Sequence, residues 1–229
     1  MTRSRESRRE AAKAREKSSS SRFLLPVVGA GVVIVAAIGA ILLTGGSGTG
    51  GGSTPLPSFS SGGAVSSADP TVTGQSLPLF DQSVGDPAVG QVIPTVQGSD
   101  FNGQSVSIDL DGRPKVLLFL AHWCSHCQAE VPAVQDWLDA GRGPTDVDLI
   151  SVATSNDPGA PNYPPDAWLE REGWTVPVIV DSNGSVAPAY GLSAFPFWVF
   201  VGADGQVTGR LTGELPIADL ETIIASLPR

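Results

Sequence analysis

The fold is decided by residues Lys115 to Pro132, which read KVLLFLAHWCSHCQAEVP. The first seven residues form a short apolar run, which is typical of a β-strand buried on both faces. Apolar residues then recur at helical spacing, at Cys127, Val131, Val134 and Leu138. A buried strand is therefore expected to lead directly into a helix, with Cys124 at the N-terminus of that helix.

This position favours a reactive Cys124. The unpaired N–H groups at the start of a helix and the positive end of its dipole stabilise a thiolate, so Cys124 is predicted to be a nucleophile. Cys127 lies three residues further along on the same helical face, close enough to form a disulfide with Cys124. A C-x-x-C pair between a strand and a helix indicates a thioredoxin-like redox site, and this setting is a much more specific signal than C-x-x-C alone.

Strands and helices alternate through the C-terminal part of the chain. Two strands are expected at Val92–Val96 and Ser105–Ile108, on either side of the turn pair Asn102-Gly103. Later strands are expected at 148–154, 176–181, 197–201 and 206–212, and helical segments near 165–172, 185–191 and 216–227. Interleaved strands and helices of this kind predict a three-layer α/β/α fold with a central mixed sheet.

Two segments carry a family resemblance. Residues 89–132 resemble the catalytic half of the membrane-anchored TlpA/ResA-like branch of the thioredoxin family, including Trp123 before the first Cys and Pro132 after the second. Residues 176–207 look like the family's second half, in which a cis-proline faces the disulfide, and Pro196 occupies that position. The resemblance implies a thioredoxin-like fold and a thiol-disulfide oxidoreductase that works outside the cytoplasmic membrane without a cofactor.

The resemblance also assigns roles by position. Cys124 and Cys127 would form the redox-active disulfide, with Cys124 forming the mixed disulfide with a substrate and Cys127 resolving it. Trp123, Phe195 and Pro196 would supply the substrate-binding surface. Exported protein thiols or disulfides are the implied substrates, and an unidentified membrane or extracytoplasmic redox partner would recharge the site.

Three positions depart from the family pattern. Ser125 and His126 lie between the cysteines, and a His there resembles DsbA-type oxidants, because a cationic or hydrogen-bonding His stabilises the thiolate and therefore the reduced protein. This favours oxidation, whereas the TlpA/ResA-like body favours reduction, so both directions stay open. Leu118 stands where many thioredoxins have a buried Asp that takes the proton of the resolving Cys. Glu130 can take this role, but as a charged residue it is expected on the solvated surface of its helix.

Two other interpretations of the cysteines compete with the redox one. A permanent structural disulfide suits an oxidising compartment, but it would close too small a loop to constrain much chain entropy. A copper or zinc site would make the protein a metallochaperone, and suitable ligand types are present at His122, Cys124, His126 and Cys127. Four ligands crowded into six residues would have difficulty converging, so no metal is assigned.

The N-terminal part carries membrane signals. Residues 1–22 hold eight of the 14 basic residues, and residues 23–43 are an uncharged, mostly apolar run. At about 1.5 Å per residue, this run matches the roughly 30 Å hydrocarbon core of a bilayer. It predicts a single transmembrane anchor in the cytoplasmic membrane with the basic tail inside. Residues 44–76 are rich in Gly and Ser and predict a flexible linker, which leaves 77–229 as the extracytoplasmic domain.

Two alternatives for this part carry less weight. A cleaved export signal also has a basic start, but its apolar stretch is usually about 7–15 residues long and ends at an A-x-A-like site, which does not follow residue 43 here. Nucleic-acid binding is disfavoured, because the chain after the tail has 14 − 8 = 6 basic and 23 − 3 = 20 acidic residues.

Overall fold

The computed structural model describes residues 69–229. The predicted basic tail (1–22), the predicted anchor (23–43) and most of the predicted linker lie outside the described residues. Within residues 69–229, none of the helices combines the length and apolar character needed to cross a membrane.

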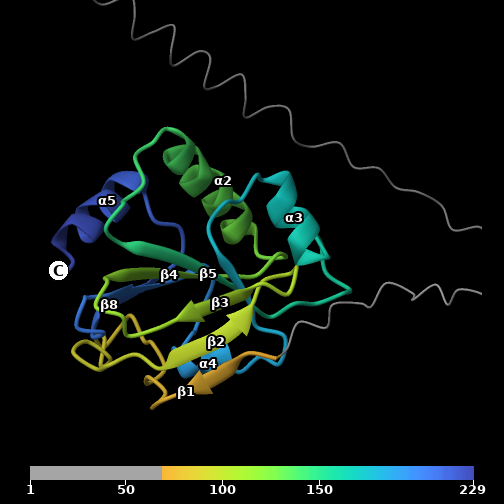
Figure 1. Ribbon diagram of the computed structural model, residues 1–229. Helices are drawn as coiled ribbons and strands as arrows, with labels where there is room; N and C mark the ends of the chain where they lie inside the picture. Colours follow the sequence, from red (N-terminus) through yellow and green to blue (C-terminus); the bar gives the residue numbers. More distant parts are fainter. Residues whose placement is uncertain (1–68) are drawn as a thin grey trace, which may run out of the picture. The chain divides into compact units, whose positions relative to one another are not determined.

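The centre of the fold is a five-stranded mixed sheet with the order β6-β5-β4-β7-β8 (Figure 1). β4 pairs in parallel with β5, and β5 with β6, whereas β7 runs antiparallel to both β4 and β8. The strands are β4 (Lys115–Leu120), β5 (Asp148–Ala153), β6 (Val178–Val180), β7 (Phe197–Val201) and β8 (Val207–Thr212). Every residue of the central strand β4 is buried, as its continuous apolar run predicts.

Each face of this sheet is covered by a different kind of layer (Figure 1). One face carries α2 (Ser125–Asp139), α3 (Pro165–Arg171) and α5 (Ile217–Ser226). The other face carries α4 (Val186–Ala189) and a three-stranded antiparallel sheet of β1 (Thr71–Thr73), β2 (Thr95–Ser99) and β3 (Ser105–Ile108). The predicted α/β fold with a mixed sheet is confirmed, and strands join the short helix in the second outer layer.

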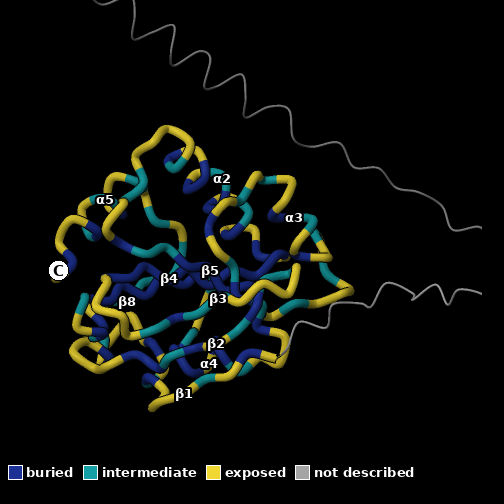
Figure 2. The backbone as a smooth tube through the Cα atoms, viewed as in Figure 1, coloured by how far each residue is buried: buried dark blue, intermediate teal, exposed yellow. Residues whose placement is uncertain are grey.

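The core has two halves because side chains alternate along a strand. Leu117 and Phe119 of β4 pack toward α4 and the small sheet, while Val116, Leu118 and Leu120 pack toward α2 and α5. Figure 2 shows the buried residues concentrated along β4 and β5, between the two outer layers. The strand that leads to the cysteines is thus held from both sides.

Two boundaries differ from the sequence prediction. The last residues of the predicted linker 44–76 belong to the fold, because β1 pairs antiparallel with β2. The strand predicted at Val92–Val96 begins instead at Thr95, since Pro94 has no N–H to donate to a ladder, and Val92 forms only an isolated bridge with Gln206. The other predicted strands and helices overlap the observed elements.

Candidate redox-active site

Cys124 is the N-cap residue of α2, directly after the buried strand β4, as predicted. No side chain caps this helix, and its first turn holds no acidic residue. The free N–H groups of that turn are therefore available to stabilise a thiolate on Cys124. Both cysteines are free thiols. The exposed fraction is 8% for Cys124 and 0% for Cys127, so Cys124 is the thiol that solvent can reach.

The Cys127 thiol is strongly held in its neutral form. Burial raises the pKa of Cys127 well above its ordinary value, and the neighbouring Cys124 and Glu130 raise it further. A thiol in this state does not ionise by itself near neutral pH. Its reaction therefore needs a nearby group that takes its proton.

Glu130 lies one turn beyond Cys127, and the prediction that it is solvated is wrong. Its exposed fraction is only 2%, and its Oε2 accepts a hydrogen bond from the Leu215 N–H at 2.8 Å. Burial raises the pKa of Glu130 to about 7, and the charge of Glu214 adds to this effect, while the Leu215 hydrogen bond opposes it. A carboxyl that titrates near neutral pH beside Cys127 is able both to accept and to donate a proton.

The dipeptide between the cysteines lies at the surface. Ser125 and His126 form the first residues of α2, and both are exposed. The Nδ1 atom of His126 lies 2.6 Å from Oε1 of Glu214, which belongs to the loop between β8 and α5. The imidazole of the residue between the cysteines is therefore contacted by a residue 88 positions away in the sequence.

The loop before β7 faces the cysteines. The peptide bond between Phe195 and Pro196 is cis, and the Sγ atom of Cys124 lies 3.8 Å from the Phe195 carbonyl oxygen. The Trp123 ring stands edge-on against the Phe195 ring, with 5.7 Å between their centroids, and its Nε1 donates to the Ser155 carbonyl at 2.8 Å. Trp123 remains 39% exposed. The structure thus brings the predicted substrate-binding residues together beside Cys124.

Backbone groups engage the ring of His122. Its Nδ1 lies 2.7 Å from the Pro161 carbonyl oxygen, and its Nε2 accepts a hydrogen bond from the Asp157 N–H at 3.1 Å. Both ring nitrogens are therefore occupied by the backbone. Across residues 69–229, no group of His, Cys, Asp and Glu side chains converges as metal ligands. The four ligands proposed for copper or zinc do not come together.

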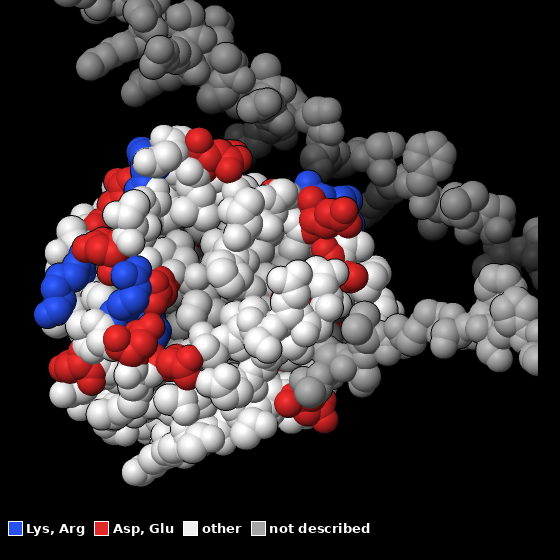
Figure 3. Space-filling model, viewed as in Figure 1, with Lys and Arg blue, Asp and Glu red and all other residues white. Residues whose placement is uncertain are grey.

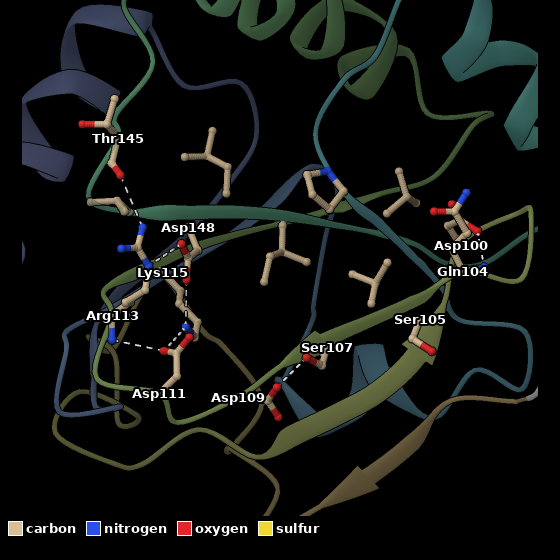
Figure 4. Close-up of a pocket in the computed structure, with 16 residues that line it drawn as sticks. Asp100, Gln104, Ser105, Ser107, Asp109, Asp111, Arg113, Lys115, Thr145 and Asp148 are labelled. Carbon is tan, nitrogen blue, oxygen red and sulfur yellow. Dashed lines mark hydrogen bonds and ion pairs between the residues drawn. The ribbon is translucent and has the colours of Figure 1, made fainter.

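A cavity of about 720 Å³ lies at the opposite end of the sheet (Figure 4). It is lined by Lys115, the first residue of β4, whereas Cys124 follows the end of that strand, which is about 20 Å long. The Lys115 ammonium donates to Asp111 at 2.6 Å and to Asp148 at 3.1 Å, and the Arg113 guanidinium donates to Asp148 at 2.8 Å. These charged groups neutralise one another, far from the cysteines.

On the face shown in Figure 3, basic side chains lie next to acidic ones. Ion pairs engage Arg113, Lys115, Arg142, Arg210 and Arg229. Since residues 69–229 hold 6 basic and 20 acidic residues, the remaining charge is predominantly negative.

Two residues that touch the site were missed by the sequence analysis. Glu214 contacts His126, and Leu215 contacts Glu130, across 88 and 85 positions of sequence. Both lie in a short turn between a strand and a helix, and no motif marks them. Only the path of the chain after β8 brings them to α2.

A dithiol that starts a helix beside a buried strand, with a cis-proline loop against its first sulfur, is the arrangement of a thioredoxin-class thiol-disulfide oxidoreductase. The chain belongs to the Redoxin family, whose profile matches residues 88–224. It is 26% identical over 141 residues to the thiol-disulfide oxidoreductase ResA of Geobacillus thermodenitrificans, which covers 61% of this chain and 78% of ResA. The soluble secreted antigen MPT53 of Mycobacterium tuberculosis is 30% identical over 114 residues, covering 50% and 60% of the two chains.

Solved structures show the same fold. StoA from Bacillus subtilis superposes with a TM-score of 0.50 at 23% identity, covering 60% of this chain and 99% of StoA. A putative protein disulfide isomerase from Bacteroides thetaiotaomicron gives a TM-score of 0.52 at 20% identity, covering 68% of this chain and 94% of the isomerase. The predicted TlpA/ResA-like thiol-disulfide oxidoreductase with a thioredoxin-like fold is therefore confirmed.

Proposed function

We propose that this chain is a membrane-anchored, extracytoplasmic enzyme that exchanges disulfides with exported proteins through Cys124 and Cys127. The observation that carries the proposal is the unequal placement of the two thiols: Cys124 is partly accessible at a helix N-terminus, 3.8 Å from the Phe195 carbonyl, and Cys127 is fully buried behind it. This placement suits Cys124 to attack the substrate and Cys127 to resolve the mixed disulfide.

The reducing direction uses both thiols in turn. The Cys124 thiolate attacks a substrate disulfide, one substrate sulfur leaves as a thiolate, and a mixed disulfide forms. Cys127 then loses its proton to the Glu130 carboxylate and attacks the Cys124 sulfur. The second substrate thiolate then leaves. The substrate has gained two electrons, and the protein has been oxidised to the Cys124–Cys127 disulfide.

The oxidising direction is the reverse. A substrate thiolate attacks Cys124 in the disulfide, and Cys127 leaves as a thiolate that takes a proton from Glu130. A second substrate thiolate then attacks the substrate sulfur of the mixed disulfide, so that a substrate disulfide forms and Cys124 leaves as a thiolate. Because the pKa of Glu130 is about 7, both of its protonation states are populated near neutral pH, and Glu130 serves either direction. The partner that recharges the site sets the net direction of electron flow.

The extracytoplasmic location rests on the N-terminal sequence. Residues 23–43 have the length and apolar character of a bilayer span, and the basic residues 1–22 favour a cytoplasmic tail. The description of the relative MPT53 as secreted supports the same side of the membrane. A disulfide-forming site is also suited to this compartment.

The proposal is tested on the purified full chain. Equilibration with glutathione buffers, followed by tryptophan fluorescence, should give a two-electron transition, because Trp123 adjoins the cysteines. Cys124→Ser should abolish turnover of a disulfide substrate, and Cys127→Ser should trap mixed disulfides with exported proteins. Glu170→Ala, which alters an exposed residue of α3 away from the cysteines, is the control and should keep both activities. Absence of a redox transition, with stoichiometric copper or zinc binding in its place, would refute the proposal and support a metallochaperone.

A further inference from the structure

The loop between β8 and α5 is held against the active site by hydrogen bonds from the residues on both sides of Glu214. The Gly213 N–H donates to the carbonyl of Pro196 at 2.8 Å. The Leu215 N–H donates to Oε2 of the buried Glu130, also at 2.8 Å. The residue between these two anchors therefore has its backbone position set by the cis-proline loop and by α2.

Glu214 uses this position to reach His126. Its Oε1 lies 2.6 Å from His126 Nδ1, and the exposed fractions of the two side chains are 49% for Glu214 and 64% for His126. Exposed pairs usually contribute little, because holding two mobile side chains together costs entropy. Here the backbone of one partner is fixed on either side and the other partner begins a helix, so less freedom is lost when the contact forms.

The contact affects the chemistry through the imidazole. His126 lies between the two cysteines, and a hydrogen bond at Nδ1 fixes which way the ring faces, as a carboxylate does for other functional histidines. An imidazole held beside a thiolate stabilises the reduced protein by charge or by hydrogen bonding. Among residues 69–229, Glu214 is the residue whose side chain hydrogen-bonds to His126.

We propose that Glu214 is a positioning residue for His126: its carboxylate orients the imidazole of this residue, which lies between Cys124 and Cys127 in the sequence, and thereby sets the thiol-disulfide equilibrium of the site. The inference rests on the proposed function and names a control element of the same site. The charged group in contact with His126 is Glu214 from the β8–α5 loop, and the titratable groups nearest in sequence on its own helix are the two thiols and Glu130.

Glu214 also carries a negative charge, which acts against a thiolate whether or not His126 is present. A double-mutant cycle separates this direct effect from positioning. The full chain, Glu214→Ala, His126→Ala and the double variant are each equilibrated with reduced and oxidised glutathione at about pH 7. In this reaction the protein disulfide is reduced to two thiols while two glutathione thiols are oxidised to one glutathione disulfide. The equilibrium constant is read from tryptophan fluorescence.

We expect Glu214→Ala to shift the equilibrium toward the disulfide form by about three- to tenfold more in the native background than in the His126→Ala background. A tenfold shift corresponds to about 30 mV in a two-electron couple. Glu170→Ala is the matched control, because it removes an exposed carboxylate of α3 that forms no ion pair or side-chain hydrogen bond with residues 69–229. It should leave the equilibrium constant unchanged.

Equal effects of Glu214→Ala in the two backgrounds would overturn the inference, since they would show that the charge of Glu214 acts on the thiols directly and not through His126. No effect in either background would overturn it as well. In both cases the unsubstituted chain still titrates with glutathione, whereas failure of the proposed function itself would remove the transition from the unsubstituted chain.

Discussion

Replacing Glu130 by Gln should stabilise the reduced protein at alkaline pH and leave its stability unchanged in acid. The pKa of Glu130 is about 7 in the folded protein, against an ordinary value of 4.5. Between these pH values the native state binds more protons than the unfolded state, so the free energy of unfolding falls as pH rises. The stability that goes with a protonated Glu130 is complete below about pH 4.5 and is lost as pH rises through about 7.

The magnitude follows from the two pKa values. A difference of about 2.5 between them corresponds to about 3 kcal/mol at a pH above both. Gln has nearly the same volume and its amide oxygen can still accept the Leu215 N–H, but it never ionises. Because a neutral acceptor binds that N–H less strongly than a carboxylate, we expect a net gain of about 2 kcal/mol above about pH 8. Near pH 4 the two proteins should agree within about 0.5 kcal/mol.

Urea unfolding of the reduced full chain, followed by tryptophan fluorescence at a series of pH values, gives this difference directly. Glu170→Gln serves as the control, since it removes an exposed carboxyl from α3 and should not reproduce the pH-dependent gain. A Glu130→Gln variant that is equally stabilised or destabilised at every pH would refute the assignment of a buried carboxyl with a raised pKa. It would also remove the basis for Glu130 as the proton acceptor of Cys127.

Three further substitutions test the contacts around the site and the core. Trp123→Phe keeps the aromatic contact but loses the Nε1 hydrogen bond to Ser155, so KM for a disulfide substrate should rise about fivefold, the equivalent of about 1 kcal/mol, with little change in kcat. Arg210→Met should lower the free energy of unfolding by about 3–5 kcal/mol, because it leaves the Asp86 carboxylate without its buried partner. Tyr190→Phe removes a buried hydroxyl that donates to a backbone carbonyl and should cost about 1–2 kcal/mol. Urea unfolding measures the last two.

Each of these expectations has a contrary result. A lower kcat with unchanged KM for Trp123→Phe would mean that the indole acts in the chemical step and not in docking. An Arg210→Met protein as stable as the unsubstituted chain would show that the attraction within the ion pair does not exceed the desolvation cost of its two charges. The same result for Tyr190→Phe would show that the freed carbonyl finds another donor.

The local parts of the fold and site follow from sequence pattern. The apolar run at Lys115 to Leu120 predicts a strand buried on both faces, and helical spacing from Cys127 onward predicts the helix that begins at Ser125. These patterns depend on residues a few positions apart, so they can be recognised from the sequence without a structure. A cis-proline at Pro196 follows from the family resemblance, and in the structure the Phe195-Pro196 bond is cis and the Phe195 carbonyl lies 3.8 Å from the first sulfur.

The elements that escaped prediction depend on distant chain segments. β1 is a short, mostly polar strand, and it forms only because β2 offers it a partner. Glu130 looks like an exposed helix residue until Leu215, 85 positions later, covers it. A periodic pattern shows which face of a helix is apolar, but it does not show which loop will close over a charged residue on that helix.

The sequence by itself determined the chemistry of this protein: two cysteines at a helix start, the fold that holds them, and apolar and basic N-terminal signals that predict a membrane anchor. Only the tertiary structure decided the surroundings of those sulfurs, namely a buried Glu130 with a pKa of about 7 and an imidazole held by Glu214. The physical reason is that covalent neighbours fix where a thiol lies along a helix. Whether that thiol is ionised, and which group takes its proton, depends on burial and on contacts that form only when residues 88 positions apart meet.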